Sequence, residues 1–299
     1  MVSEPRRRPV HAMSVDVEEH FQVSAMEGVV DRADWPRHES RVEANVDALL
    51  DLFARQRVRA TFFTLGWVAE RRGAMVRRIV AAGHELASHG QTHRRVYSQT
   101  PAAFRADVRD SRRLLEDVGG VPVRGYRAPS FSIDARTPWA HAILAEEGYA
   151  YSSSVYPIRH DHYGMPTAPR DPYRPLDDSP FLEVPIATVT LLGRRWPGGG
   201  GGYFRLLPYG VSRWALARRQ DREGAAAVFY IHPWEIDPDQ PRVAGLAAKT
   251  RFRHYLNLAR TKPRLDRLAG DFAWDRMDRV FAVAGQQAHA RQAVQGDAA

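Results

Sequence analysis

The chain of 299 residues contains no cysteine, which excludes both disulfide bonds and thiolate metal ligands. Any metal ion that it binds must therefore be held by histidine, aspartate or glutamate. It also lacks an apolar run of about 18 residues, so no membrane-spanning helix is expected. The basic segment 1–9 is not followed by an apolar core of signal-peptide length. These absences favour a cytoplasmic protein without a membrane span.

Acidic residues are outnumbered: 43 Lys and Arg face 35 Asp and Glu, which gives a formal net charge of +8. A positive charge of this size raises nucleic-acid binding as a hypothesis. The cations are dispersed among acids, however, as in residues 105–113, a pattern typical of a solvated helix face. We therefore expect no nucleic-acid partner. The charge is equally compatible with an acidic polysaccharide or a membrane surface.

Helical and strand patterns alternate along the chain, which predicts parallel strands joined by helical crossovers in one large α/β domain. A capping box of Ser40 and Glu43 is expected to begin the first helix. Thr100 and Pro101 predict the start of another. The expected helices span residues 40–57, 73–82, 101–118 and 134–147. The first expected strand begins at Met13. The others span residues 59–65, 84–88, 123–127, 149–155, 181–192 and 226–232.

Chemically active side chains follow four of these strands. Asp16 and Glu18 alternate along the first strand and should share one face. His89 and His93 lie four residues apart after another strand, a spacing that allows two imidazoles to bind one ion such as Zn²⁺. Two further apolar strands end in single polar residues, which are Arg127 and His232.

The order of these four motifs resembles that of the polysaccharide deacetylases, a carbohydrate esterase family that shares the nodulation-protein deacetylase domain. The resemblance implies a distorted, incomplete (β/α)7 barrel, with its chemistry at the carboxyl ends of the strands. It covers a catalytic domain of residues 10–285, between the tail 1–9 and a disordered polar tail 286–299. Residues 16–19, 199–207 and 252–258 are similar to the subgroup found in exopolysaccharide gene clusters. The portion specific to that subgroup is expected from about residue 156.

The resemblance also implies an activity, the removal of N-acetyl groups from N-acetylhexosamine units of a polysaccharide or its precursor. A divalent metal, with zinc as the first choice, would be held by Glu18, His89 and His93. Each remaining site residue receives a role. Asp16 would be the base, Arg127 would orient it, and His232 would be the acid. The backbone N–H of Ser130 or Phe131 would bind the oxyanion. Sugar rings would stack on Tyr203 and Trp234, with Trp196 and Phe204 as further aromatic candidates.

Three details stay open at this point. Glu19 competes with Glu18 as the third ligand, because many relatives carry adjacent aspartates where this chain has Val17 after Asp16. The acidic partner that relatives place beside the catalytic histidine has no clean match. Asp177, Asp178 and Glu183 are the nearest candidates. The glycine run 198–202 fits either a flexible connector or a loop beside the substrate.

Two other functions compete with deacetylation. The first is hydrolysis of a cyclic imide or ureide, a reaction of metal-poor relatives, against which the pair of His89 and His93 argues. The second is a catalytically silent protein that binds carbohydrate or serves an export assembly, against which the joint presence of Asp16, Arg127 and His232 argues. The expected partner is a polysaccharide or oligosaccharide, and peripheral association with an exopolysaccharide assembly complex is compatible with the sequence.

Overall fold

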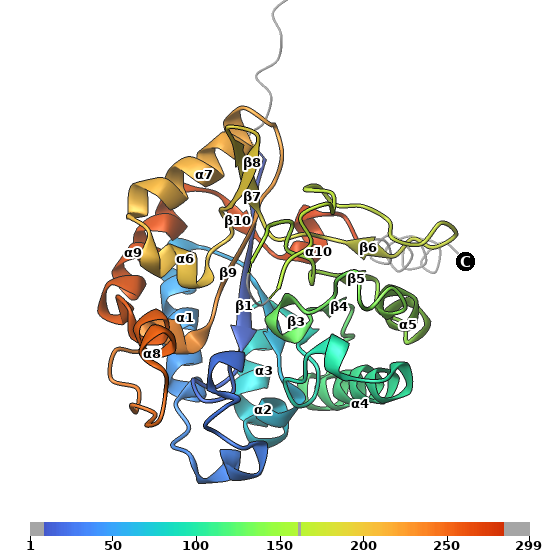
Figure 1. Cartoon of the computed structure of the whole chain (residues 1–299), viewed down its shortest axis with the longest axis vertical. Coiled ribbons are helices and arrows are strands. Elements are labelled where there is room, and N and C mark those ends of the chain that lie inside the picture. Colours follow the sequence, from blue (N-terminus) through green and yellow to red (C-terminus); the bar gives the residue numbers. More distant parts are fainter. Residues whose placement is uncertain (1–8, 161–162, 284–299) are drawn as a thin grey trace, which may run out of the picture.

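A computed structural model describes residues 9–160 and 163–283 of the chain. It contains a curled sheet of eight parallel strands with helices packed around its outer face (Figure 1). The α/β incomplete barrel predicted from the sequence is therefore confirmed. Apart from Pro9, the predicted tail 1–9 lies outside the described residues, as does the whole of 286–299. Among the described residues, no helix is long and apolar enough to cross a bilayer.

The strand β1 (His11–Val17) lies next to one edge of the sheet and is buried along its whole length. It pairs with β2 (Thr61–Thr64) on one side and with β9 (Val228–Ile231) on the other. The sheet continues from β2 through the remaining strands in chain order. These are β3 (Glu85–Ser88), β4 (Gly125–Tyr126), β5 (Tyr151–Ser152) and β6 (Leu182–Glu183), while β10 (Trp274–Asp275) pairs with the start of β1. Six strands of this sheet match predicted ones, β6 matches only the start of the strand predicted at 181–192, and β10 is the strand of the sheet that the sequence did not reveal.

Ten helices accompany the sheet in the described part of the chain. Thr100 Oγ1 caps α4 by accepting the amide hydrogen of Ala103 at 3.2 Å, and Pro101 follows at the first position, as predicted. The helices are α1 (Val42–Gln56), α2 (Gly66–Arg71), α3 (Gly73–Ala81), α4 (Pro101–Gly119), α5 (Ala140–Glu146), α6 (Gly201–Leu206), α7 (Tyr209–Asp221), α8 (Ala248–Tyr255), α9 (Leu258–Asp271) and α10 (Met277–Val280).

The cap of α1 differs from the predicted Ser40–Glu43 box. Glu19, from the segment after β1, accepts the amide hydrogens of Arg41 at 3.0 Å and of Val42 at 3.2 Å, and Ser40 Oγ donates to its other oxygen. A negative charge at this position satisfies unpaired N–H groups and the positive end of the helix dipole. Glu43 is instead paired with Arg78 at 2.9 Å. A long-range carboxylate has therefore replaced the local cap.

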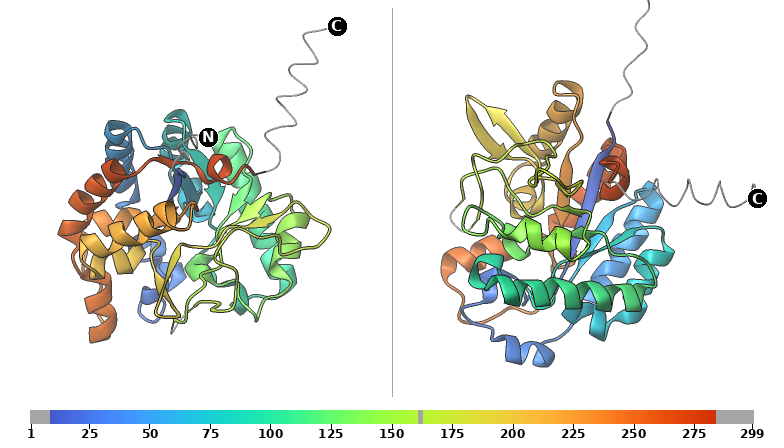
Figure 2. Two further views of the ribbon diagram at one scale, coloured as in Figure 1. Left: turned by 90° about the horizontal axis from the view of Figure 1, so that it is seen from above. Right: turned by 90° about the vertical axis from the view of Figure 1, so that its right-hand side faces the viewer.

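Two predicted elements differ from the structure in more than their exact ends. The strand predicted at 181–192 is wrong because it divides at Pro185: β6 joins the barrel, whereas β7 (Thr188–Leu191) leaves it and pairs with β8 (Arg194–Pro197) in an antiparallel hairpin. Figure 2 shows this hairpin projecting from the barrel. The helix predicted at 134–147 begins only at Ala140, because Asp134 and Thr137 first form a hydrogen-bonded turn.

The glycine run packs on the barrel and is not an exposed connector. Gly198, Gly199 and Gly200 are buried, and the carbonyl of Gly199 accepts the amide hydrogen of Tyr230 at 2.7 Å. Gly200 has a φ of 107° and pairs with Tyr230 of β9. A Cβ atom on Gly200 would lie 2.1 Å from the carbonyl oxygen of Tyr230. The run therefore consists of glycine because its backbone packs directly on β9 and leads into α6.

This close approach makes a testable prediction. Gly200→Ala should lower the free energy of unfolding by more than about 2 kcal/mol, because the added methyl group meets backbone at a left-handed position. The matched control is Gly202→Ala, whose Cβ would meet nothing closer than a side-chain nitrogen of Arg205 at 3.8 Å. Urea unfolding of both variants measures the difference. Equal stabilities would contradict the close-packing account of the run.

Candidate active site

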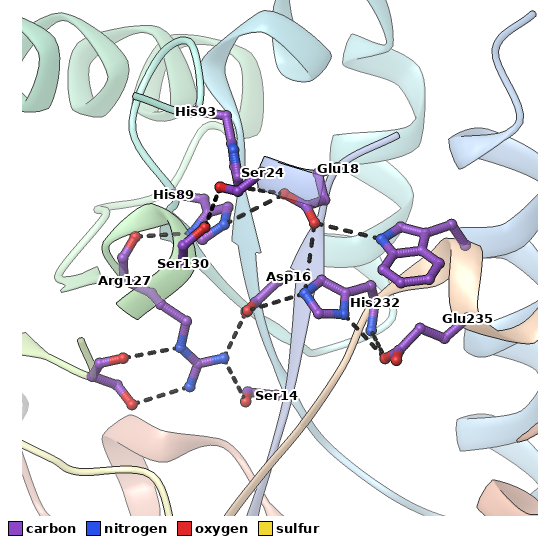
Figure 3. Close-up of polar contacts among 12 residues, drawn as sticks. Ser14, Asp16, Glu18, Ser24, His89, His93, Arg127, Ser130, His232 and Glu235 are labelled. Carbon is purple, nitrogen blue, oxygen red and sulfur yellow. Dashed lines mark hydrogen bonds and ion pairs between the residues drawn. The ribbon is translucent and has the colours of Figure 1, made fainter. Parts of the chain in front are cut away.

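The four predicted motifs converge at the carboxyl ends of the parallel strands (Figure 3). Asp16 lies in β1 and Glu18 directly after it, whereas His89, Arg127 and His232 follow β3, β4 and β9. These side chains are buried, with at most 3% of Asp16, Glu18, His89 or Arg127 exposed. His232 is the most accessible, at 18% of its side chain. Ionisable groups at this depth must be paired or bind a charged partner.

Three of them form a set suited to a metal ion. Glu18, His89 and His93 each offer one ligand atom, and the three atoms lie within 4.8 Å of one another. Glu18 Oε2 lies 2.7 Å from His93 Nε2 and 3.8 Å from His89 Nε2, yet it is fully buried and accepts no hydrogen bond from the described residues. A carboxylate oxygen left in this state, facing two imidazole nitrogens, fits a divalent metal ion.

The second contact of His89 orients it for this task. Its Nδ1 lies 2.8 Å from the backbone carbonyl oxygen of Arg127, so Nδ1 carries the hydrogen and donates it. The other nitrogen, Nε2, is then the unprotonated one that a metal requires. Neither sequence spacing nor the motif itself indicates this contact, because it joins the ends of β3 and β4.

The charge states of the same residues also suit a metal. Burial lowers the pKa of His89 to about 4, so the imidazole is neutral at physiological pH. Burial alone would raise the pKa of Glu18, but attraction to His93, His232 and His89 outweighs that effect and lowers the value to about 2. Both groups are thus in the deprotonated form that binds metal ions.

Glu19, the alternative ligand, lies elsewhere. Its carboxylate caps α1 through the amides of Arg41 and Val42, and burial raises its pKa. Glu18 therefore faces the two histidines, and Glu19 faces the helix. Alternation along an extended segment explains the division, because side chains at adjacent positions point in opposite directions.

Asp16 and Arg127 form a buried ion pair at 2.6 Å. The guanidinium also donates to Ser14 Oγ at 2.9 Å and to the carbonyl and hydroxyl oxygens of Ser153 at 3.0 Å each. Only Oδ1 of Asp16 is used in this pair, whereas Oδ2 lies 3.9 Å from His232 Nε2. Arg127 thus holds one oxygen of Asp16 and leaves the other turned into the site.

The acidic partner of His232 is Glu235, which the sequence interpretation missed. Glu235 Oε2 accepts the Nδ1 hydrogen of His232 at 3.0 Å, and Oε1 accepts from Arg205 Nε at 2.7 Å. The candidates near residue 180 are wrong: Asp177 and Asp178 are exposed, and Glu183 pairs with His141 at 3.0 Å. A glutamate three residues after a histidine, with proline between them, is a local signal that could have been used.

These contacts set the charges of the pair. Burial opposes protonation of His232, but Glu235, and then Glu18 and Asp16, raise its pKa to about 9. Burial likewise opposes ionisation of Glu235, but Arg205 and His232 lower its pKa to about 2. His232 is therefore an imidazolium at neutral pH, with Nδ1 held by Glu235 and Nε2 directed at the site.

Ser130 and Phe131 both adopt the left-handed conformation, with φ of 54° and 50°. Such strain at two consecutive non-glycine residues is typical of functional turns. The amide of Phe131 already donates to the carbonyl of Ala128 at 3.0 Å, so Ser130 is the better candidate for an oxyanion donor. Ser24 Oγ, which the sequence did not indicate, forms a hydrogen bond with Ser130 Oγ.

The aromatic residues predicted to bind sugar rings differ in their exposure. Trp234 is 6% exposed, stacks on His232 and His254, and directs Nε1 at Glu18, so no face is open to a sugar ring. Phe204 is buried against Phe229. Tyr203 is half-buried, with its ring edge-on to His160. Trp196 is half-exposed, but it belongs to the projecting hairpin.

Comparisons with known proteins agree with this geometry. Residues 34–151 match the family model described as polysaccharide deacetylase, and residues 153–282 match a domain of unknown function, DUF3473. A crystal structure from Mycobacterium smegmatis, assigned to the polysaccharide deacetylases, has a TM-score of 0.61 and 21% sequence identity. It covers 96% of this chain and 94% of that one. At this identity the likeness shows a shared fold.

Among curated proteins, the chain is similar to chitooligosaccharide deacetylases from two bacteria. The one from Sinorhizobium fredii is 40% identical over 106 residues, which cover 32% of this chain and 46% of that protein. The one from a Bradyrhizobium species is 32% identical over 157 residues, which cover 50% of this chain and 65% of that protein. The chain thus spans less than two thirds of either relative.

The geometry predicts which acid binds metal. Glu18→Gln should weaken zinc binding more than about 100-fold, because the loss of a metal ligand costs more affinity than the loss of a residue that only supports a ligand. Glu19→Gln is the matched control and should bind zinc as the unaltered chain does. Isothermal titration calorimetry of the metal-free protein with zinc measures both affinities. If the two variants exchanged behaviours, Glu19 would be the ligand and the assignment of Glu18 would be wrong.

Proposed function

Through residues 34–151 the chain belongs to the polysaccharide deacetylase family, and from this premise we propose that it is a metal-dependent hydrolase. Its reaction is the removal of N-acetyl groups from N-acetylhexosamine units of a polysaccharide or its precursor. The observation that carries the proposal is the buried convergence of Glu18, His89 and His93 with the Asp16–Arg127 pair and with His232.

Hydrolysis of an amide requires an activated water, stabilisation of the tetrahedral oxyanion and a proton for the departing amine. Zinc suits the donor set of Glu18, His89 and His93, and when bound such an ion supplies a water of lowered pKa and polarisation of the acetyl carbonyl. The carboxylate of Glu18 and the neutral imidazole of His89 need lose no proton at neutral pH to serve as ligands.

Asp16 is placed to act as the base. Because Arg127 occupies Oδ1, the remaining oxygen Oδ2 is the one directed at the position of the attacking water. The ion pair with Arg127 also fixes the orientation of this carboxyl group. The backbone N–H of Ser130 is the oxyanion donor that the turn offers.

His232 is placed to act as the acid. Its raised pKa of about 9 keeps the imidazolium form at neutral pH, and Glu235 holds the Nδ1 hydrogen, which leaves the Nε2 hydrogen for the leaving amine. Nε2 lies on the same side as Asp16 Oδ2, at 3.9 Å. Base and acid therefore face one reacting position from two different strands.

The substrate class follows from the relatives and the resemblance. The curated relatives are described as chitooligosaccharide deacetylases, and another, from Helicobacter pylori, as a peptidoglycan deacetylase. All of these names refer to glycans with N-acetylated sugars. The segments 199–207 and 252–258, similar to the exopolysaccharide subgroup, support a role in exopolysaccharide biosynthesis. They also touch in space, because Arg205 donates to the carbonyl of His254 at 2.6 Å.

Metal and base are tested together. The zinc-loaded chain should release acetate from N-acetylglucosamine oligomers, and a chelator, His89→Ala or Asp16→Asn should each reduce the rate by about 10³-fold. Release that survives both chelation and His89→Ala would exclude the metal role. A folded, zinc-binding chain that releases no acetate from any N-acetylated glycan would favour the carbohydrate-binding alternative.

The acid is tested by changing the leaving group. Glu235→Gln and His232→Ala should slow release of acetate from the N-acetyl glycan by about 10²-fold. Both should leave hydrolysis of p-nitrophenyl acetate nearly unchanged, because its phenolate departs without a proton. Glu183→Gln, at a buried histidine-bound glutamate outside the site, controls for general damage. Equal losses on the amide and the ester would contradict the acid role.

A further inference from the structure

Exposed apolar side chains are concentrated in one segment that the reaction does not use. Nine large hydrophobic residues are exposed in the described part of the chain, and six of them lie within residues 191–214. Single exposed apolar residues are normal, whereas a group of them marks an interaction surface. The six are Leu191, Leu192, Trp196, Leu206, Val211 and Trp214.

The most exposed members form the tip of the β7–β8 hairpin. Leu192 is 93% exposed and follows Leu191, at 43%, into a turn completed by Gly193. Leu191 pairs with Arg194 across the hairpin, and Val189 pairs with Trp196, so these four side chains share one face. The tip therefore presents two leucines beside an arginine and half-exposed Trp196.

The helix α7 covers only the base of this face. Val189 and Ala215 both lie within 4 Å of the position that a Cβ atom would take on Gly198, which places α7 against the Val189 side of the hairpin. Trp214, the neighbour of Ala215, is 40% exposed. In Figures 1 and 2 the hairpin extends beside α7 and projects from the barrel. The tip, with Leu191, Leu192, Arg194 and Trp196, is hereafter the hairpin surface.

The charged side chains contributed by this segment of the sequence are all of one sign. No acidic residue occurs between Glu183 and Asp221, whereas six arginines do. Of these, Arg205 and Arg219 are buried in ion pairs, and Arg213 pairs with Asp271 at 2.9 Å. Arg194 is exposed at the tip. The remaining two are Arg195, whose guanidinium donates to the carbonyls of Pro166 and Ala168, and Arg218, which lies 5.9 Å from the ring of Trp214.

We propose that the hairpin surface binds the chain peripherally to an anionic lipid bilayer. Leucines at a projecting tip can enter the acyl region, and a half-exposed tryptophan suits the boundary between acyl chains and headgroups. Arg194, beside them, suits lipid phosphates. Nucleic acid would match the charge but leave the leucines in water, and an apolar protein groove would leave the arginine without a partner.

The position of the surface separates it from the catalytic residues. The hairpin leaves the barrel where Ala187 donates to the carbonyl of Val228, at the start of β9, whereas His232 follows the end of that strand. In Figure 1 the hairpin and the carboxyl end of β1, where Asp16 lies, are at opposite ends of the barrel. Bilayer binding at the hairpin therefore leaves the site facing away from the lipid.

Vesicle co-sedimentation of the full chain tests the proposal. The chain should bind vesicles of phosphatidylcholine mixed with phosphatidylglycerol, and should bind more weakly as salt screens the arginine. Replacing both tip leucines (Leu191→Ser with Leu192→Ser) should weaken binding at least about tenfold. Arg194→Gln should weaken it about fivefold. Neither change should alter the zinc affinity or the unfolding midpoint, because the hairpin tip contacts neither the site nor the core.

Phe252→Ser is the matched control, because Phe252 is a 60% exposed aromatic residue on α8, outside the hairpin surface. This variant should bind vesicles as the unaltered chain does. Three results would overturn the proposal: no binding to the mixed vesicles, undiminished binding by the double-leucine variant, or an equal loss with Phe252→Ser. Sedimentation velocity without lipid distinguishes another occupant, because self-association that the leucine changes abolish, with no vesicle binding, would assign the surface to a second copy.

Discussion

The site depends on one fully buried guanidinium, that of Arg127. Burying an unpaired charge costs several kcal/mol, so its surroundings must supply acceptors. They come from β1 as Asp16 and Ser14, from Ser153 just beyond β5, and from the Met277 sulfur at 3.9 Å. The backbone carbonyl of the same residue accepts a hydrogen from His89. Arg127 therefore orients the candidate base, Asp16, through its side chain and the candidate metal ligand His89 through its backbone.

The other half of the site is held by a chain of contacts from outside the barrel. His232 is bound by Glu235, and Glu235 by Arg205 of α6, whose position follows from the close packing of the glycine run on β9. Arg205 also donates to the carbonyl of His254, in the last turn of α8, and to that of Leu256, just after it. The segments 199–207 and 252–258 therefore meet at the residue that binds Glu235. Through Arg205, these two segments therefore support the contact between Glu235 and His232.

Much of this arrangement was accessible from sequence because the ends of parallel strands must meet. That constraint predicts that Asp16, Glu18, His89, Arg127 and His232 gather at one edge, and the structure brings them together. It cannot predict hydrogen bonds between residues far apart in sequence. The cap of α1 is such a case, because Glu19 accepts its N–H groups in place of the expected Ser40–Glu43 box and is therefore not the residue that faces the two histidines. The composition of the glycine run indicates backbone freedom, whereas in the structure the missing Cβ atoms also allow a close approach to β9. Glu235 was not predicted although its spacing from His232 is local, because in relatives the acidic partner lies in a different part of the sequence.

Crystals grown with zinc and measured on both sides of the zinc absorption edge test the central claim most directly. The account predicts one strong anomalous peak, from a zinc ion bound by Glu18, His89 and His93. Asp16 and His232 should face this ion, and Glu19 should still cap α1. A peak bound by other residues, or no peak with these three side chains well ordered, would contradict it.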